Sequence, residues 1–160
     1  MLCNLEESFL VVRITGFILA LPMMIKAWKI QDLVGRITPR RMVRGGALDA
    51  ERVRYLCDRV LGIFRITGYR HTCMRRCLLL YHFLRCYGVP VTINFGAKLE
   101  EGGLTGHSWL SLDGRIHLDT SEKVDQFTCF FSLPDGGSTG GGAGGSDLGR
   151  ASGLEDISFD

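Results

Sequence analysis

The feature that most constrains the fold of this chain is a helix with both ends marked, within residues 72–90. Thr72 is a good N-cap because its hydroxyl can accept a hydrogen bond from an unpaired backbone N–H of the first turn. Gly88 suits the left-handed residue that closes a helix, and Pro90 prevents the helix from restarting. The body between these ends is mostly apolar, which predicts a helix covered on most sides at the centre of a domain. Its apolar residues are Cys77, Leu78, Leu79, Leu80, Tyr81, Phe83, Leu84 and Cys86.

Cys73 would be the first residue of this helix. Unpaired N–H groups and the positive end of the helix dipole favour a thiolate at that position. A thiol with a lowered pKa is how many cysteine nucleophiles are activated, although a buried cysteine is more often an inert core residue. Position alone therefore leaves both interpretations of Cys73 open.

Length and charge narrow the class of protein. A chain of 160 residues can form one domain with a real core and some appendages. The net charge of +2 is too small to indicate nucleic acid, and aromatic residues do not alternate with Lys and Arg as in a single-strand-binding surface. We therefore expect no nucleic-acid partner.

We expect no disulfide framework among the six cysteines. Three of them fall on the predicted helix, where a bond between Cys73 and Cys77 would distort one turn. The apolar run at residues 14–25 follows charged residues and lacks a small-residue cleavage site, so it does not look like a secretory signal. A reducing cytoplasm is the predicted compartment. A zinc site built from these two cysteines and His71 or His82 is a weak alternative, because no second ligand pair matches.

Residues 1–34 have the composition of helix. The uncharged stretch is only about a dozen residues, shorter than the roughly 20 that a membrane span needs, and Pro22 would kink or split a helix. We expect two short helices or one kinked helix whose apolar faces are buried. The surface that covers them is the rest of the chain, a partner protein or, through residues 9–25, a membrane contacted peripherally.

Composition divides the chain into three parts. Residues 1–48 form an N-terminal helical segment and a basic linker. Residues 49–134 form the main domain, and residues 135–160 are a Gly-rich tail predicted to be disordered. The charges of the linker are Arg36, Arg40, Arg41 and Arg44.

The main domain begins with helices and continues with strands. Residues 49–65 carry apolar side chains at helical spacing behind Asp49, a plausible N-cap, and the short connection predicts packing against the Cys73 helix. Residues 91–95 alternate as in a half-buried strand, residues 107–119 look like a β-hairpin, and residues 126–133 favour another strand. The predicted fold class is α+β, with a central helix packed on a small antiparallel sheet.

A thiolate nucleophile needs a base, and the base needs an acceptor that orients it. His82 lies within the predicted helix, and His71 lies too close to Cys73 in sequence for good proton-transfer geometry. His107 and Asp119 lie on the hairpin. We therefore select Cys73 as nucleophile, His107 as base and Asp119 as orienting carboxylate.

The hairpin register decides whether His107 and Asp119 can meet. A two-residue loop would pair Ser108 with Asp119 and place the histidine and the aspartate on opposite faces. A three-residue loop pairs Ser111 with Arg115, sets His107 directly opposite Asp119, and gathers the hairpin leucines and Ile116 on the other face. We predict the three-residue loop, since hydrophobic pattern and triad chemistry both favour it.

Two motifs resemble those of lasso-peptide leader peptidases, in the transglutaminase-like branch of papain-type cysteine enzymes. Residues 73–90 are similar to their Cys-Leu-x-Arg-Ser-Leu-Ala-Leu…Leu-Leu-Arg-x-x-Gly-Ile pattern, and residues 107–114 to their His-Ala-Trp-Val-x-x-x-Gly. Asp119 falls where the family carries its Asp, and the phenylalanine-rich residues 126–134 resemble the end of that domain. The resemblance covers residues 49–134. Met74, Cys77 and Ser108 depart from the pattern by small changes.

The resemblance implies a transglutaminase-like fold and a cysteine peptidase that removes the leader from a ribosomally made precursor through a Cys73-His107-Asp119 triad. No cofactor is implied. The implied partners are the precursor's leader peptide, a separate leader-recognition protein, because the N-terminus is too short for a recognition domain, and an asparagine-synthetase-like cyclase. The Gly-rich tail has no counterpart in the pattern.

Two other functions remain open from the sequence. One is an acyl transferase on the same fold, which would pass the thioester to an amine. The other is a non-catalytic interaction module whose Cys, His and Asp are structural.

Overall fold

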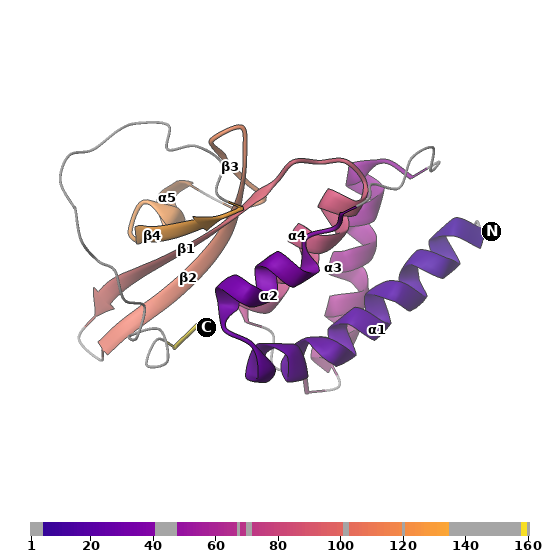
Figure 1. Ribbon diagram of the computed structural model, residues 1–160, viewed down its shortest axis with the longest axis horizontal. Helices are drawn as coiled ribbons and strands as arrows, with labels where there is room; N and C mark the ends of the chain where they lie inside the picture. The colour runs from indigo at the N-terminus through magenta and orange to yellow at the C-terminus, as the bar shows by residue number, and fades with distance from the viewer. Residues whose placement is uncertain are drawn as a thin grey trace.

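The computed structural model describes residues 5–40, 48–66, 68–69, 72–100, 103–119, 121–134 and 158–159. Four longer helices lie beside a small sheet, so the predicted α+β class is confirmed (Figure 1). The helices are α1 (Leu5–Ala27), α2 (Ile30–Ile37), α3 (Ala50–Ile66), α4 (Cys73–Cys86) and the short α5 (Ser121–Val124). The strands are β1 (Thr92–Glu100), β2 (Gly103–Leu112), β3 (Arg115–His117), β4 (Thr128–Leu133) and β5 (Ser158–Phe159).

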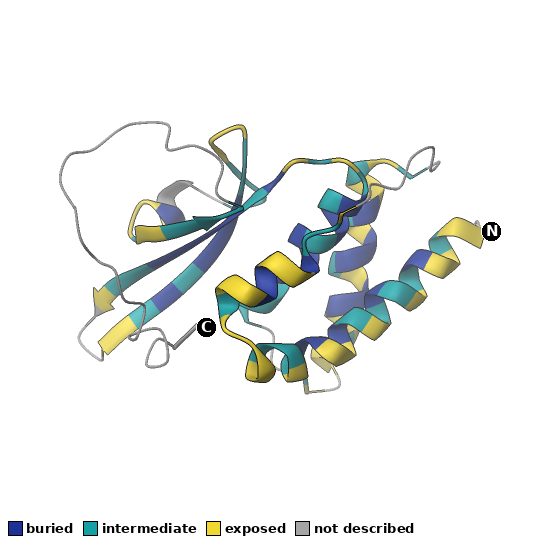
Figure 2. Cartoon of the chain, in the orientation of Figure 1, coloured by how far each residue is buried: buried dark blue, intermediate teal, exposed yellow. Residues whose placement is uncertain are grey.

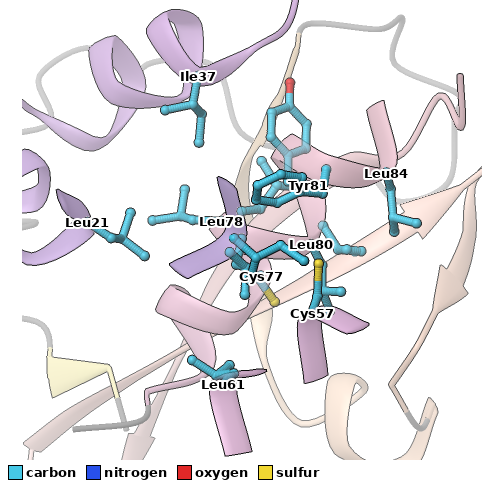
Figure 3. Packing of buried hydrophobic residues seen from close by; sticks show 14 of the residues in the cluster. Leu21, Ile37, Cys57, Leu61, Cys77, Leu78, Leu80, Tyr81 and Leu84 are labelled. Atoms are coloured by element: carbon cyan, nitrogen blue, oxygen red, sulfur yellow. The ribbon is translucent and has the colours of Figure 1, made fainter. Parts of the chain in front are cut away.

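Helix α4 is the centre of the fold, as predicted. Thr72 caps it by accepting a hydrogen bond at 3.4 Å from the backbone N–H of Arg75, and Gly88 has φ +86° just beyond its end. All eight apolar residues of its body are buried. Side chains from α1, α2 and α3 gather around it, among them Leu21, Ile37 and Leu61 (Figure 3).

The N-terminal region forms two helices, but they do not divide at Pro22. Helix α1 continues through this proline, and the break lies at Trp28 and Lys29. A proline has no N–H to donate to the carbonyl four residues earlier, here that of Ile18. The hydroxyl of Tyr69 donates to this carbonyl at 3.2 Å, so the group that the proline leaves without a helical partner is still paired.

Helix α1 is long and apolar enough to cross a membrane, judged by length and composition alone. The sequence analysis expected a segment too short for a membrane span, because it counted only the uncharged stretch of the helix. One stripe of the helix, formed by Leu10, Ile14, Ile18 and Leu21, is buried in the same core as α3 and α4. The core thus contains residues from both sides of position 48, where the sequence analysis divided the chain.

Polar contacts fix the other helices around α4. The carboxylate of Asp49 accepts a hydrogen bond from the N–H of Arg52 at 2.7 Å, which confirms the predicted cap of α3. At the end of α2, the hydroxyl oxygens of Thr38 and Tyr81 lie 2.8 Å apart. Nδ1 of His82 lies 2.6 Å from the carbonyl oxygen of Ile37.

The sheet has the strand order β3-β2-β1-β4 with antiparallel pairing, and β5 pairs in parallel with β2. Asn94 joins its three longer strands. The Asn94 amide donates to Ser111 Oγ on β2 at 2.9 Å and accepts from Ser132 Oγ on β4 at 2.7 Å. The predicted strand at 126–133 is present as β4. Linker residues 41–47 and tail residues 135–157 and 160 lie outside the described residues.

The register of the β2–β3 hairpin differs from the prediction. Leu112 pairs with Arg115, so the loop has only two residues, Asp113 and Gly114. Both have positive φ, +50° and +76°, as the turn that best matches the twist of a hairpin requires. The predicted three-residue loop, with Ser111 opposite Arg115, is wrong.

Asp119 nevertheless reaches His107, because β3 ends early. A continued strand in this register would hold the two side chains on opposite faces. The strand stops at His117, and Leu118 has φ +66°, a left-handed conformation that is rare for leucine. The turn at Leu118 breaks the alternation, and the carboxylate of Asp119 lies 2.9 Å from His107 Nε2.

Gly96 on β1 makes room for the ring of Trp109 on β2. A Cβ at this position would lie 2.9 Å from two carbons of the indole and 2.9 Å from the carbonyl oxygen of Thr128. These distances are too short for carbon, so only glycine fits without movement of the sheet. The pairing of β1 with β4 shifts register between Phe95 and this glycine.

We expect Gly96→Ala to lower the free energy of unfolding by about 1–3 kcal/mol, because the added methyl group overpacks the sheet. Thermal unfolding would measure this as a lower Tm, by about 2–4 °C per kcal/mol. Gly62→Ala on α3 is the matched control, since a Cβ there meets nothing within 4 Å. The control should be neutral or slightly stabilising, because alanine favours helix. Equal Tm values for both variants would contradict this account of Gly96.

Candidate active site

Cys73 occupies the first position of α4, as the sequence predicts. Its side chain is partly exposed, whereas Cys77, one turn further along, is buried. Because Thr72 caps the helix immediately before Cys73, the backbone N–H groups of the first helical turn lie next to the thiol. This is the part of α4 where a negative charge is best stabilised.

His107 lies on β2 between Cys73 and Asp119. Asp119 Oδ2 accepts a hydrogen bond from Nε2 at 2.9 Å, and the imidazole also makes a hydrogen bond with the thiol of Cys73. Since Nε2 is engaged by the carboxylate, Nδ1 is the ring nitrogen left for the sulfur. The structure thus brings together all three residues that the sequence selected.

Two aromatic rings hold the imidazole of His107 in place. Phe127 stacks on it with centroids 4.9 Å apart, and Trp109 lies parallel to it at 6.1 Å. The sequence analysis did not assign either ring to the site. Their positions in the sequence could have indicated this role, since Trp109 belongs to the motif that contains the histidine and Phe127 belongs to the phenylalanine-rich run.

The hydrogen bond between Cys73 and His107 shifts both pKa values toward an ion pair. Burial raises the pKa of Cys73, but hydrogen bonds with His107 and Ser108 outweigh burial, so the pKa is lowered overall. The hydrogen bond with Cys73 raises the pKa of His107, burial lowers it, and the bond with Asp119 raises it further. A thiolate beside an imidazolium is the form that these shifts favour.

Cys77 attaches helix α4 to strand β2 directly below the site. Its Sγ donates a hydrogen bond to the carbonyl oxygen of Ser108 at 3.1 Å. Burial raises the pKa of this thiol to about 12, so it stays protonated and can donate. The buried hydroxyl of Ser108 makes no hydrogen bond of standard geometry, but it lies near enough to Cys73 and Cys77 to lower the pKa of each.

Arg76 supports the carboxylate side of the site. Its guanidinium makes two hydrogen bonds to Asp58 on α3, at 2.9 and 3.1 Å. Burial lowers the pKa of this guanidinium, but the hydrogen bonds and charge of Asp58 and the charge of nearby Asp119 raise it, so that the pKa is raised overall. The arginine therefore carries positive charge between α3 and the aspartate that orients His107.

The other histidines do not join this group. His82 stacks on Phe17 and contacts the carbonyl of Ile37, and burial lowers its pKa. His117 pairs with Leu110 across the hairpin, and His71 lies outside the described residues. Within the described part of the chain, no three His, Cys, Asp or Glu side chains are grouped as metal ligands.

These groups suit acyl chemistry. A thiolate at a helix start can attack a carbonyl carbon, and backbone N–H groups beside it can stabilise the oxyanion that forms. An imidazolium held by a carboxylate can then give a proton to the leaving group. Hydrolysis and transfer of an acyl group use the same first step.

Comparison with known proteins gives a family. A family profile described as Transglutaminase-like superfamily matches residues 17–132, which is most of the chain. Comparisons with curated proteins and with solved structures found no match. The matched region runs from within α1 to β4 and contains Cys73, His107 and Asp119. The chain belongs to the transglutaminase-like superfamily, which includes cysteine peptidases and acyl transferases.

Proposed function

We propose that this protein is a cysteine peptidase that removes the leader from a ribosomally made lasso-peptide precursor. The observation that carries the peptidase chemistry is the set of contacts from the Cys73 thiol through His107 to the carboxylate of Asp119. The substrate class rests on the resemblance of residues 73–90 and 107–114 to leader peptidases. The partners in this proposal are the leader peptide, a separate leader-recognition protein and a cyclase that acts on the product.

In this mechanism the thiolate of Cys73 attacks the carbonyl carbon of the scissile peptide bond. The oxyanion of the tetrahedral intermediate accepts hydrogen bonds from backbone N–H groups at the start of α4. As the C–N bond breaks, His107 gives its proton to the leaving amine and a thioester to Cys73 remains. Water then loses a proton to the histidine, attacks the thioester, and releases the leader as a carboxylic acid.

The surroundings of the imidazole support this sequence of proton transfers. Asp119 holds the ring by Nε2 and favours its charged form, while Phe127 and Trp109 restrict its rotation. A ring fixed in this way keeps Nδ1 directed at the sulfur during both proton transfers. An acyl transferase would use the same residues, but an amine would replace water in the last step.

The direct test is cleavage of a lasso-peptide precursor by the purified protein, with a leader-recognition protein added. We expect Cys73→Ala to lower the cleavage rate by about a thousandfold or more while leader binding persists, because the nucleophile is lost. Cys129→Ala is the matched control, since it removes an exposed thiol from β4. Mass spectrometry of the products measures both variants.

Two results of this assay would contradict the peptidase proposal. One is cleavage by Cys73→Ala at the normal rate. The other is a product that carries an added primary amine in place of a new carboxylic acid, which would indicate acyl transfer.

We expect iodoacetamide to label Cys73 well below pH 8, because the thiolate is already present there. The rate should fall only when the pH drops below the lowered pKa of this thiol. Cys77 is an internal control, since its raised pKa, about 12, and its burial should leave it unlabelled. Peptide mass spectrometry against pH separates the two sites. A labelling profile of Cys73 that matches a free thiol would argue against the ion pair.

We expect Asp119→Asn to reduce kcat by at least about tenfold, because the orienting carboxylate is lost while size is kept. It should also move the upper limb of the pH profile of kcat to lower pH, since Asp119 raises the pKa of His107. Asp113→Asn is the control, as asparagine tolerates the positive φ of the hairpin turn. An unchanged pH profile in Asp119→Asn would remove Asp119 from the proposed machinery.

A further inference from the structure

Helix α1 carries a second apolar stripe that the fold leaves exposed. The buried stripe described above lies in the core with α3 and α4, while the outward surface of the helix is exposed along its length (Figure 2) and carries a row of apolar residues and one glycine. We call this surface the outer stripe. Its residues are Leu5, Phe9, Val12, Gly16, Leu19 and Met23, and the exposed fractions of the five large side chains among them are 91, 66, 68, 61 and 76% in chain order.

The spacing of the outer stripe points to a second helix as its cover. Its residues follow one another at alternating intervals of four and three, which is a seven-residue repeat. A straight seam with this repeat is the surface that two packed helices share. A lipid surface demands no such repeat.

Charge along α1 selects the direction of the second helix. Its first turn contains Glu6 and Glu7, and its last turn contains Lys26. Both glutamates already have interactions within the chain: Arg52 on α3 binds Glu7 at 2.7 Å, and Glu6 also has a partner, although it stays exposed near the N-terminal end of the outer stripe. A partner helix with the same distribution of charge would place acid beside base only if it ran antiparallel, which is also the direction that the helix dipoles favour.

The chain itself supplies such a helix. Gly16 is the middle residue of α1 and lies on the outer stripe, and a Cβ built there meets nothing within 4 Å. A two-fold axis close to Gly16 would set each N-terminal half of the stripe against the C-terminal half of the other copy. The small residue at the crossing would let the two helices approach closely.

We propose that the protein forms a homodimer in which the outer stripes of two α1 helices pack antiparallel about Gly16. Phe9 and Val12 of each copy then pack on Leu19 and Met23 of the other. The acidic first turn of each helix lies near Lys26 of the other. The two Cys73 sites remain on separate copies, so this proposal does not depend on catalytic activity.

Sedimentation velocity of the purified full chain is the test. We expect a dimer whose dissociation constant rises by more than about tenfold in Val12→Glu, because this change buries an unpaired charge at the seam. Ile63→Glu is the matched control, since Ile63 is a 56% exposed apolar residue on α3 outside the stripe. It should leave the dimer intact. Circular dichroism of each variant confirms that the helices remain folded.

A charge exchange tests the antiparallel direction separately. Lys26→Glu should weaken the dimer by about two- to fivefold at low salt, and adding Glu6→Lys should restore it. A double variant that stays weak would overturn the antiparallel arrangement. A chain that remains monomeric at about 100 μM would overturn the dimer proposal. Flotation of that monomer with anionic lipid vesicles would then show that the outer stripe binds a membrane, and no flotation would leave the dimer proposal equally overturned.

Discussion

The contact between the Cys77 thiol and the carbonyl of Ser108 is the interaction on which the candidate site depends. It joins the central helix to β2, one of the two inner strands of the sheet. Cys73 lies one turn before Cys77 on α4, and His107 immediately precedes Ser108 on β2. This buried attachment between helix and strand therefore helps to set the distance between nucleophile and base, and the packing of the α4 body in the core prevents the helix from rotating away from it.

A second constraint fixes the start of this helix from the other side. Tyr69, just before α4, donates to the carbonyl of Ile18 that Pro22 leaves unpaired, and Arg75 lies over its ring at 4.9 Å. The proline in α1 is thus part of the connection between α1 and the beginning of α4. The same helix that presents an exposed outer stripe also helps to hold the chain that leads into Cys73.

The sequence was most informative where a local rule acts alone. Both caps of α4, the Asp49 cap and the apolar body of α4 followed from residue type and spacing, and the structure agrees with each. It was least informative where tertiary contacts decide. The turn at Leu118 could not be foreseen, because a positive φ is rare for leucine and is held here by packing against the core.

The hairpin shows how a wrong intermediate step led to a correct pair. Alternation of side chains suggested that only one register could join His107 to Asp119, and this assumed that the second strand continued to the aspartate. The strand stops two residues earlier, so register no longer decides the orientation of Asp119. Likewise, Pro22 suggested a kink or a split in α1, but the helix continues through it, and Tyr69 pairs the carbonyl that the proline leaves without a helical partner.

Cys73 and Cys77 show that surroundings, and not residue type, make a thiol reactive. Both lie in the first half of one helix and both have Ser108 as a neighbour. Burial dominates at Cys77 and raises its pKa, since no imidazole compensates for the loss of water. At Cys73, burial is weaker than the combined hydrogen bonds, and His107 supplies both a proton donor and a positive charge. One turn of helix thus separates a thiol that holds the fold together from one that can act as a nucleophile.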